Sequence, residues 1–193
     1  MKKIFIILAF ALVSCGTGPW ITYKENFDVY KKSIFENPKV SIKTNGIFVE
    51  QGELNNNSDY RAFMIFYRNG YCLLGKVDNA EWKISLSKFI QKLKLQSDQE
   101  FNLYRVANDS LFIDRFGSNK NLYYRWVKNY ECKVLSDSEI EVIKSTTTFD
   151  NYPVQDLSIV YKFYPSTEIP DYKPTSWFID KKWYNKNLHE SRK

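Results

Sequence analysis

Histidine is almost absent from this chain of 193 residues: the one copy, His189, lies near the C-terminus in a polar segment. Catalysis and metal binding by histidine are therefore not expected. The chain also lacks a glycine-rich phosphate loop and the motifs G-x-S-x-G, H-E-x-x-H and C-x-x-C. The sequence predicts no cofactor, no metal site and no catalytic residue. It leaves enzymatic activity undecided, with a non-enzymatic role favoured.

Glycine and proline are scarce, with 7 and 6 copies, whereas aromatic residues make up 17% of the chain. Disordered chains have the opposite composition, so this class is excluded. Tyrosine, phenylalanine and tryptophan favour β-strands. The composition therefore predicts a folded domain that is rich in strands.

One long apolar run, Ile4–Val13, stands at the start of the chain, after Lys2 and Lys3. It is shorter than the ~20 residues that a membrane-spanning helix needs, and its basic-then-apolar order is typical of an export signal. The next residues, Ser14 and Cys15, complete a sequence that resembles a bacterial lipobox, at which the signal is cut before a lipid-modified cysteine. We therefore expect Cys15 to carry fatty-acyl chains and to anchor an exported lipoprotein in a membrane.

This interpretation divides the chain into three parts. Residues 1–14 form the signal peptide, residues 15–21 the lipidated cysteine and a short tether, and residues 22–193 a single β-rich domain with an irregular basic tail. Gly16 stands where an aspartate would indicate retention in the inner membrane, and residues 16–20 contain no acidic cluster of the kind associated with surface display. We expect the anchor to lie in the outer membrane, with the domain facing the periplasm.

Positive charge is concentrated at the two ends of the chain, which has a net charge of +6. Of the 28 basic residues, two belong to the predicted signal and five to residues 181–193; of the 22 acidic residues, Glu190 belongs to that tail, so the body keeps 21 of each sign. A neutral body predicts no nucleic-acid groove, so no nucleic-acid partner is expected. The tail is expected to be a solvated end, with contact to anionic lipid or polysaccharide as the alternative.

Three cysteines are present, and Cys15 is assigned to the lipid. Cys72 and Cys132 remain, each within an apolar, strand-like run, and their spacing fits no metal site. An oxidising compartment allows a disulfide between them. Two buried free thiols, acting as small apolar side chains, are the other interpretation.

Eight apolar segments are separated by turn residues, as in a chain of β-hairpins. Between two of the segments stands Asn69-Gly70, a strong hairpin signal, because both central residues of a type I′ turn need positive φ. The predicted strands are residues 47–50, 60–68, 71–77, 101–106, 111–116, 122–135, 139–148 and 157–164.

Two helices are predicted. Thr22 and Glu25 have capping-box spacing, and apolar residues then recur at helical intervals up to Pro38, which predicts a helix at about 23–36. A second apolar stripe, opposite several lysines, predicts an amphipathic helix at about 80–95. We expect this second helix to lie as a lid on a sheet or on a barrel end; a helix on the membrane surface is the alternative.

The fold class that these elements predict is mainly β: an antiparallel meander of about eight strands, closed into a barrel, with an N-terminal helix and one inserted helix. Closure removes exposed strand edges, and eight strands suit a small barrel. A two-sheet β-sandwich is the alternative.

Aromatic side chains are the richest resource for binding, with one group around Trp126 and another in the segment that begins at Trp177. They can stack on sugars or line an apolar cavity, and core packing is their commoner role. Paired carboxylates could hydrolyse glycosides, but the sequence does not show which carboxylates would meet. Glu139 and Glu141 share one strand face and are expected to be solvated.

Several stretches carry a resemblance: the cleavage site Val13-Ser14-Cys15 and segments 43–48, 66–71, 104–113, 173–177 and 181–184. With them the chain resembles lipoproteins of Bacteroidetes-type bacteria that contain a lipocalin-like β meander. Ser110, within Asp-Ser-Leu, also matches the short O-glycosylation signal of exported proteins in these bacteria. The chain departs from lipocalins in having no Gly-x-Trp beside the first predicted strand. The resemblance implies no activity and no catalytic residue.

The predicted function is a membrane-anchored, non-enzymatic lipoprotein that binds an apolar or glycan ligand or supports an envelope protein complex. Two alternatives stay open: a glycan-active enzyme that uses paired carboxylates, and a purely structural lipoprotein that binds a protein partner. The enzyme requires two acidic groups ~5–9 Å apart in a cleft. The structural protein requires a large exposed aromatic patch and no enclosed cavity.

Overall fold

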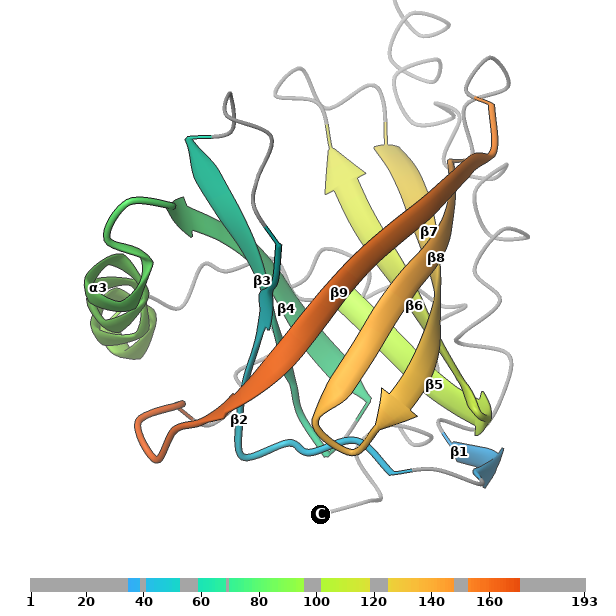
Figure 1. The fold of residues 1–193 in the computed structure, drawn as a ribbon, viewed down its shortest axis with the longest axis horizontal. Coiled ribbons are helices and arrows are strands. Elements are labelled where there is room, and N and C mark those ends of the chain that lie inside the picture. The colour runs from blue at the N-terminus through green and yellow to red at the C-terminus, as the bar shows by residue number, and fades with distance from the viewer. Residues whose placement is uncertain are drawn as a thin grey trace, which may run out of the picture.

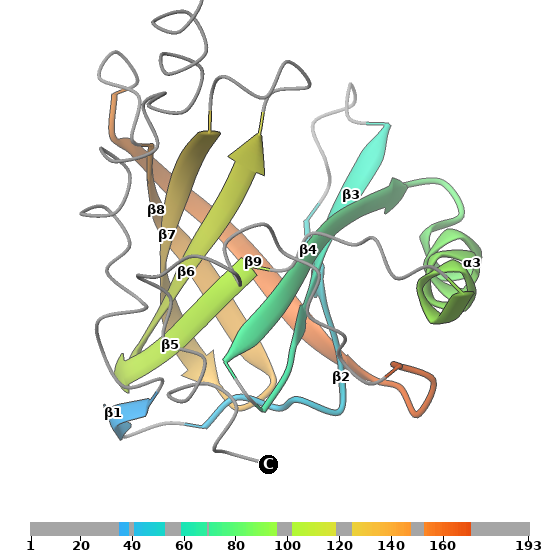
Figure 2. The same ribbon diagram turned by 180° about the vertical axis from the view of Figure 1, so that it is seen from behind.

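The structure, a computed structural model, describes residues 35–38, 41–52, 59–68, 70–95, 102–118, 125–147 and 153–170. Strands β2 to β9 form a closed antiparallel barrel, with helix α3 outside it (Figure 1, Figure 2). The elements are β1 (Phe35–Pro38), β2 (Gly46–Glu50), β3 (Tyr60–Phe66), β4 (Tyr71–Asp78), α3 (Trp82–Leu95), β5 (Asn102–Asn108), β6 (Ser110–Ser118), β7 (Arg125–Ser136), β8 (Glu139–Thr147) and β9 (Gln155–Pro165).

The barrel follows the order of the chain, because each strand from β2 to β8 pairs with the strand that follows it. Strand β2 then pairs with β9, from Gly46↔Pro165 to Glu50↔Tyr161, and this pairing closes the sheet on itself. The predicted meander of eight strands and its closure into a barrel are confirmed, and the sandwich is excluded. The predicted strands match the observed ones apart from small shifts at their ends.

Strand β1 runs parallel to the C-terminal part of β5, whereas β4 pairs with the N-terminal part of the same strand. Phe35 and Glu36 pair with Val106 and Ala107, so the helix predicted at about 23–36 is wrong at its C-terminal end. The rest of that prediction lies outside the described residues. Helical spacing of apolar residues is a local signal. Here the backbone N–H and C=O groups at the edge of β5 favour strand pairing over a helix.

Aromatic rings fill one end of the barrel, where the β3–β4, β5–β6 and β7–β8 hairpins turn. Side chains alternate inward and outward along each strand, and the inward ones form one buried cluster. Within it Phe48 makes edge-to-face contacts with Phe66 at 5.5 Å and with Phe163 at 5.3 Å, and Phe66 contacts Tyr104 at 4.9 Å. Each such pair contributes about 0.5–1.5 kcal/mol beyond the burial of its area. We call these four rings the floor.

Helix α3 packs on the outer face of β3 and β4 (Figure 1). Its buried residues Leu86, Ile90 and Leu93 join an outward-facing apolar cluster that includes Phe63. The ring of Phe63 meets that of Phe89 edge to face at 5.0 Å. The predicted amphipathic helix is confirmed, and of the two expected positions it takes the sheet rather than the barrel end. The outer face of the sheet is apolar at this point, so its burial under α3 stabilises the fold.

The hairpin predicted at Asn69-Gly70 is present, with Phe66 paired to Cys72, but its turn differs from the expected type I′ form. The Gly70 N–H donates to the Tyr67 carbonyl at 3.1 Å, and Gly70 has a φ of +85°. Gly70 is therefore the last residue of the turn, the position at which three-residue hairpins need a left-handed backbone.

Candidate functional site

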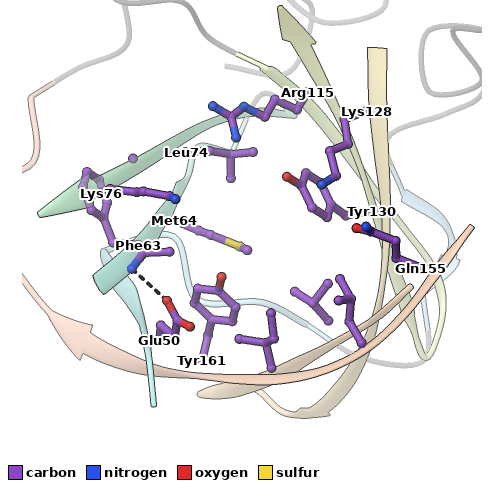
Figure 3. A pocket seen from close by; sticks show the side chains of 15 residues that line it. Glu50, Phe63, Met64, Leu74, Lys76, Arg115, Lys128, Tyr130, Gln155 and Tyr161 are labelled. Carbon is purple, nitrogen blue, oxygen red and sulfur yellow. Dashed lines mark hydrogen bonds between the residues drawn. The ribbon is translucent and has the colours of Figure 1, made fainter. Parts of the chain in front are cut away.

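A cavity of about 530 Å³ occupies the barrel at the end opposite the floor (Figure 3). We call it the barrel cavity. Every strand of the ring except β5 contributes to its lining. Its volume falls within the range of about 300–1,000 Å³ that is usual for small-molecule sites.

The deep part of the barrel cavity is lined by aliphatic side chains. Met64 pairs with Leu74 across β3 and β4, and Val142 pairs with Ile159 across β8 and β9. Leu157 lies on the same face as Ile159, two residues nearer the start of β9. These side chains come from two pairs of adjacent strands, with β2 between the pairs, and form two apolar parts of the wall, which suit a hydrocarbon group.

Three basic side chains, Lys76, Arg115 and Lys128, line the barrel cavity (Figure 3). They come from β4, β6 and β7, and Glu50 is the one acidic residue in the lining, which gives a net charge of +2. Neither Lys76 nor Lys128 forms an ion pair or a hydrogen bond with another residue in the part of the chain that the structure describes. The Lys128 ammonium lies 5.3 Å from the centre of the Tyr130 ring.

Glu50 is held against the wall at the end of β2. Its Oε2 accepts a hydrogen bond from the Ala62 N–H at 2.9 Å, and its carbonyl accepts one from Arg61 at 3.3 Å. Glycoside hydrolysis needs a second carboxyl group about 5–9.5 Å away. Among the described lining residues there is no second carboxylate. The described cavity thus lacks the pair that the enzymatic alternative requires.

Tyr161 contributes a neutral hydroxyl that points into the barrel cavity (Figure 3). Burial raises the pKa of Tyr161 well above its ordinary value, and the negative charge of Glu50 raises it further. The phenol therefore stays protonated at neutral pH and can donate a hydrogen bond to a ligand.

Cys72 and Cys132 both lie in the inward-facing cluster as buried free thiols. Burial raises the pKa of both, and the charge of Asp114 raises that of Cys72 further while Glu131 does the same for Cys132. Both thiols are therefore poor nucleophiles in the folded protein. A disulfide between them stays a prediction.

Ser110 opens β6 directly after a tight turn. Ala107 pairs with Ser110, so the turn has two central residues, and the first of them, Asn108, has a φ of +55°. Ser110 is half-buried, whereas the next residue, Leu111, is fully buried. Glycosylation of Ser110 stays a prediction.

Several residues singled out in the sequence lie elsewhere. Cys15 and the segment that begins at Trp177 lie outside the described residues, and so do Tyr123 and Tyr124. Glu141 accepts a hydrogen bond from Ser158 at 2.8 Å in an exposed position, away from the cavity lining. The sequence analysis did not single out Lys76, Arg115 or Lys128.

No metal site is evident in the described ranges, where no three histidine, cysteine, aspartate or glutamate side chains are grouped to hold an ion. Within the same ranges no helix has the length and apolar character to cross a membrane. Comparison with protein-family models, with curated proteins and with solved structures finds no match to this chain.

Proposed function

We propose that this chain is an exported lipoprotein, anchored through Cys15 in the outer membrane with its domain facing the periplasm, and that its barrel binds a small ligand without transforming it. The barrel cavity is the observation that carries the proposal. The interior is filled by aromatic rings at one end and hollow at the other, and the hollow part has both an apolar wall and polar groups. Such a combination is typical of small-molecule sites.

The cavity favours an apolar ligand over a glycan. Its deep wall is aliphatic, whereas sugar recognition relies on exposed aromatic faces and many hydrogen bonds. The enzymatic alternative has less support because the described lining holds one carboxylate, Glu50. The structural alternative has less support because the exposed large apolar side chains of the described residues are scattered over several elements: Tyr60, Ile84, Leu95, Leu135 and Val154.

Ligand capture in cells tests the proposal. The wild-type protein and a Leu157→Trp variant are purified side by side, and the small molecules that each releases on denaturation are compared by mass spectrometry. The indole fills part of the cavity, so the variant should lose a compound that the wild type carries. Lys162→Trp, at an exposed position of the same strand, is the matched control and should keep that compound. Identical extracts from wild type and Leu157→Trp would contradict the proposal.

The membrane anchor is tested by cell fractionation. Acyl chains stabilise membrane binding by roughly 0.8 kcal/mol per buried methylene, so two or more chains on Cys15 hold the protein without help from its basic tail. Cys15→Ser should block lipidation and leave the signal uncut. Glutamine at Lys181, Lys182 and Lys186 should leave the protein in the membrane pellet. Release of this tail variant would show that electrostatic attraction holds the protein instead.

A further inference from the structure

Two positive side chains lie side by side on the wall of the barrel cavity. Arg115 on β6 is the direct cross-strand partner of Lys128 on β7, and both line the cavity, so both point to the same side of the sheet. Direct partners in an antiparallel pair have Cβ atoms about 4.5–5.5 Å apart, and like charges at such positions destabilise the sheet. No carboxylate of the described residues forms an ion pair with Lys128.

Lys76 brings a third positive charge to the lining of the barrel cavity. It follows Leu74 on the inward face of β4, and its ammonium points into the cavity (Figure 3). Each basic residue lies two positions farther from the nearest hairpin turn than an apolar or aromatic residue on the same inward face of its strand: Lys76 beyond Leu74, Arg115 beyond Ile113 and Lys128 beyond Tyr130. On β4, β6 and β7 the inward face is therefore apolar or aromatic near the turns and basic beyond them, whereas Glu50 and Tyr161 supply polar groups on β2 and β9.

We propose that the ligand is a single-chain amphiphile with an anionic head group, a carboxylate or a phosphate monoester. The head group lies between Lys76, Arg115 and Lys128, and the chain extends toward the floor along the aliphatic wall. This inference rests on the proposed function and names its ligand class. An anion between Arg115 and Lys128 removes their mutual repulsion and forms charge-assisted hydrogen bonds with both.

The cavity also limits the length of the ligand's hydrocarbon chain. The rings of Phe48, Phe66 and Tyr104 are fully buried and block passage through the barrel, so the chain ends above them. The Tyr161 hydroxyl, which stays protonated, can donate a hydrogen bond to a water or another polar group in the cavity. A neutral or cationic head group would leave Lys76 and Lys128 without an ion-pair partner among the described residues.

Isothermal titration calorimetry on the lipidated protein in lipid nanodiscs, with empty nanodiscs as the reference, tests the head group. Four compounds share one dodecyl chain: dodecanoate, dodecyl phosphate, dodecanol and dodecylammonium. At least one of the two anions should bind about tenfold or more tightly than dodecanol, because hydrogen bonds to charged groups are the strong ones. A preference between the two anions identifies the head group and supports the proposal in either direction.

The other outcomes separate this inference from the proposed function. Equal affinity for dodecanol and both anions, or tighter binding of dodecylammonium, overturns the inference and leaves a ligand-binding barrel. Failure of all four compounds to bind counts against the barrel as a ligand site. Lys76→Gln together with Lys128→Gln should lower anion affinity to that of dodecanol. Lys133→Gln, an exposed position on β7, should change nothing.

Lys128→Gln alone gives a second readout that a structural role would not give. The same variant should show a smaller Tm increase when the anion is added, because one contact to the head group is lost. An anion-induced Tm increase equal to that of the wild type would overturn the assignment of Lys128 to the head group.

Discussion

A close cross-strand contact on the outer wall of the barrel allows a sharp test of the packing. Gly75 on β4 is the partner of Phe63 on β3, and a Cβ atom added at Gly75 would lie 2.3 Å from Cζ of that ring. Phe63 is 1% exposed, and its ring is held from the other side by Phe89 of α3. The ring is therefore packed between β4 and α3.

Gly75→Ala is predicted to lower the free energy of unfolding by about 1 kcal/mol. Overpacking in a well-packed region costs about 1–3 kcal/mol, and the better strand propensity of alanine returns about 0.5–1 kcal/mol. Phe63→Ala alone is predicted to cost about 3–5 kcal/mol through the loss of a fully buried ring. In the Phe63→Ala background, however, Gly75→Ala should be neutral or stabilising, because the clashing ring is gone.

Urea unfolding of the four proteins, followed by circular dichroism, measures the coupling between the two sites, which we expect to be about 1–3 kcal/mol. Gly46 supplies a matched control. A Cβ atom there would lie 2.3 Å from the Phe163 ring and also 2.3 Å from the Tyr164 carbonyl oxygen, which is backbone. Phe163→Ala should therefore fail to rescue Gly46→Ala. Equal losses from Gly75→Ala with and without the Phe63 ring would refute the reasoning.

Three further predictions concern the floor, a surface ion pair and the thiols. Tyr104→Phe removes a 2.7 Å hydrogen bond to a backbone carbonyl and should cost about 0.5–1.5 kcal/mol in urea unfolding. The Lys43 ammonium lies 3.1 Å from the Asp137 carboxylate and lowers the pKa of Asp137 below 3.8. The ion pair therefore stabilises the fold above about pH 4, and this stabilisation is lost as the pH falls. NMR titration should show a higher pKa of Asp137 in the Lys43→Gln variant. Iodoacetamide at about pH 8 should label Cys72 and Cys132 in urea but not in the folded protein, because burial raises both pKa values; rapid labelling of the folded protein would contradict their burial.

The strands could be predicted because their pattern is local. Alternating apolar residues set both the strands and the side that each side chain faces, and glycine at position 70 marked the first hairpin. The turn type could not be predicted, because it depends on the register in which Phe66 meets Cys72. Strand β1 could not be predicted either, since its partner β5 lies far along the chain.

The basic residues of the barrel cavity were not predicted, although the sequence contained a signal for them. Lys76, Arg115 and Lys128 each continue the inward-facing side of a strand by two residues, beyond an apolar or aromatic side chain. A charged residue on an otherwise inward apolar face indicates that the interior is polar or hollow at that level. The sequence of each strand shows these charged residues, but whether they meet at one end of a closed barrel depends on strand register and barrel closure.

The pairing of β2 with β9 has a consequence for how the protein folds. Every other neighbouring pair in the ring joins strands that are consecutive in the chain, whereas this pair joins the first and the last strand of the ring. Loop-closure entropy disfavours such distant contacts, so we expect the hairpins to form early and the β2–β9 pairing to form last. A chain exported from its N-terminus would expose the edge of β2 until β9 arrives. Because β9 supplies Leu157, Ile159 and Tyr161 to the cavity, the protein gains its binding site in the same step that removes this aggregation-prone edge.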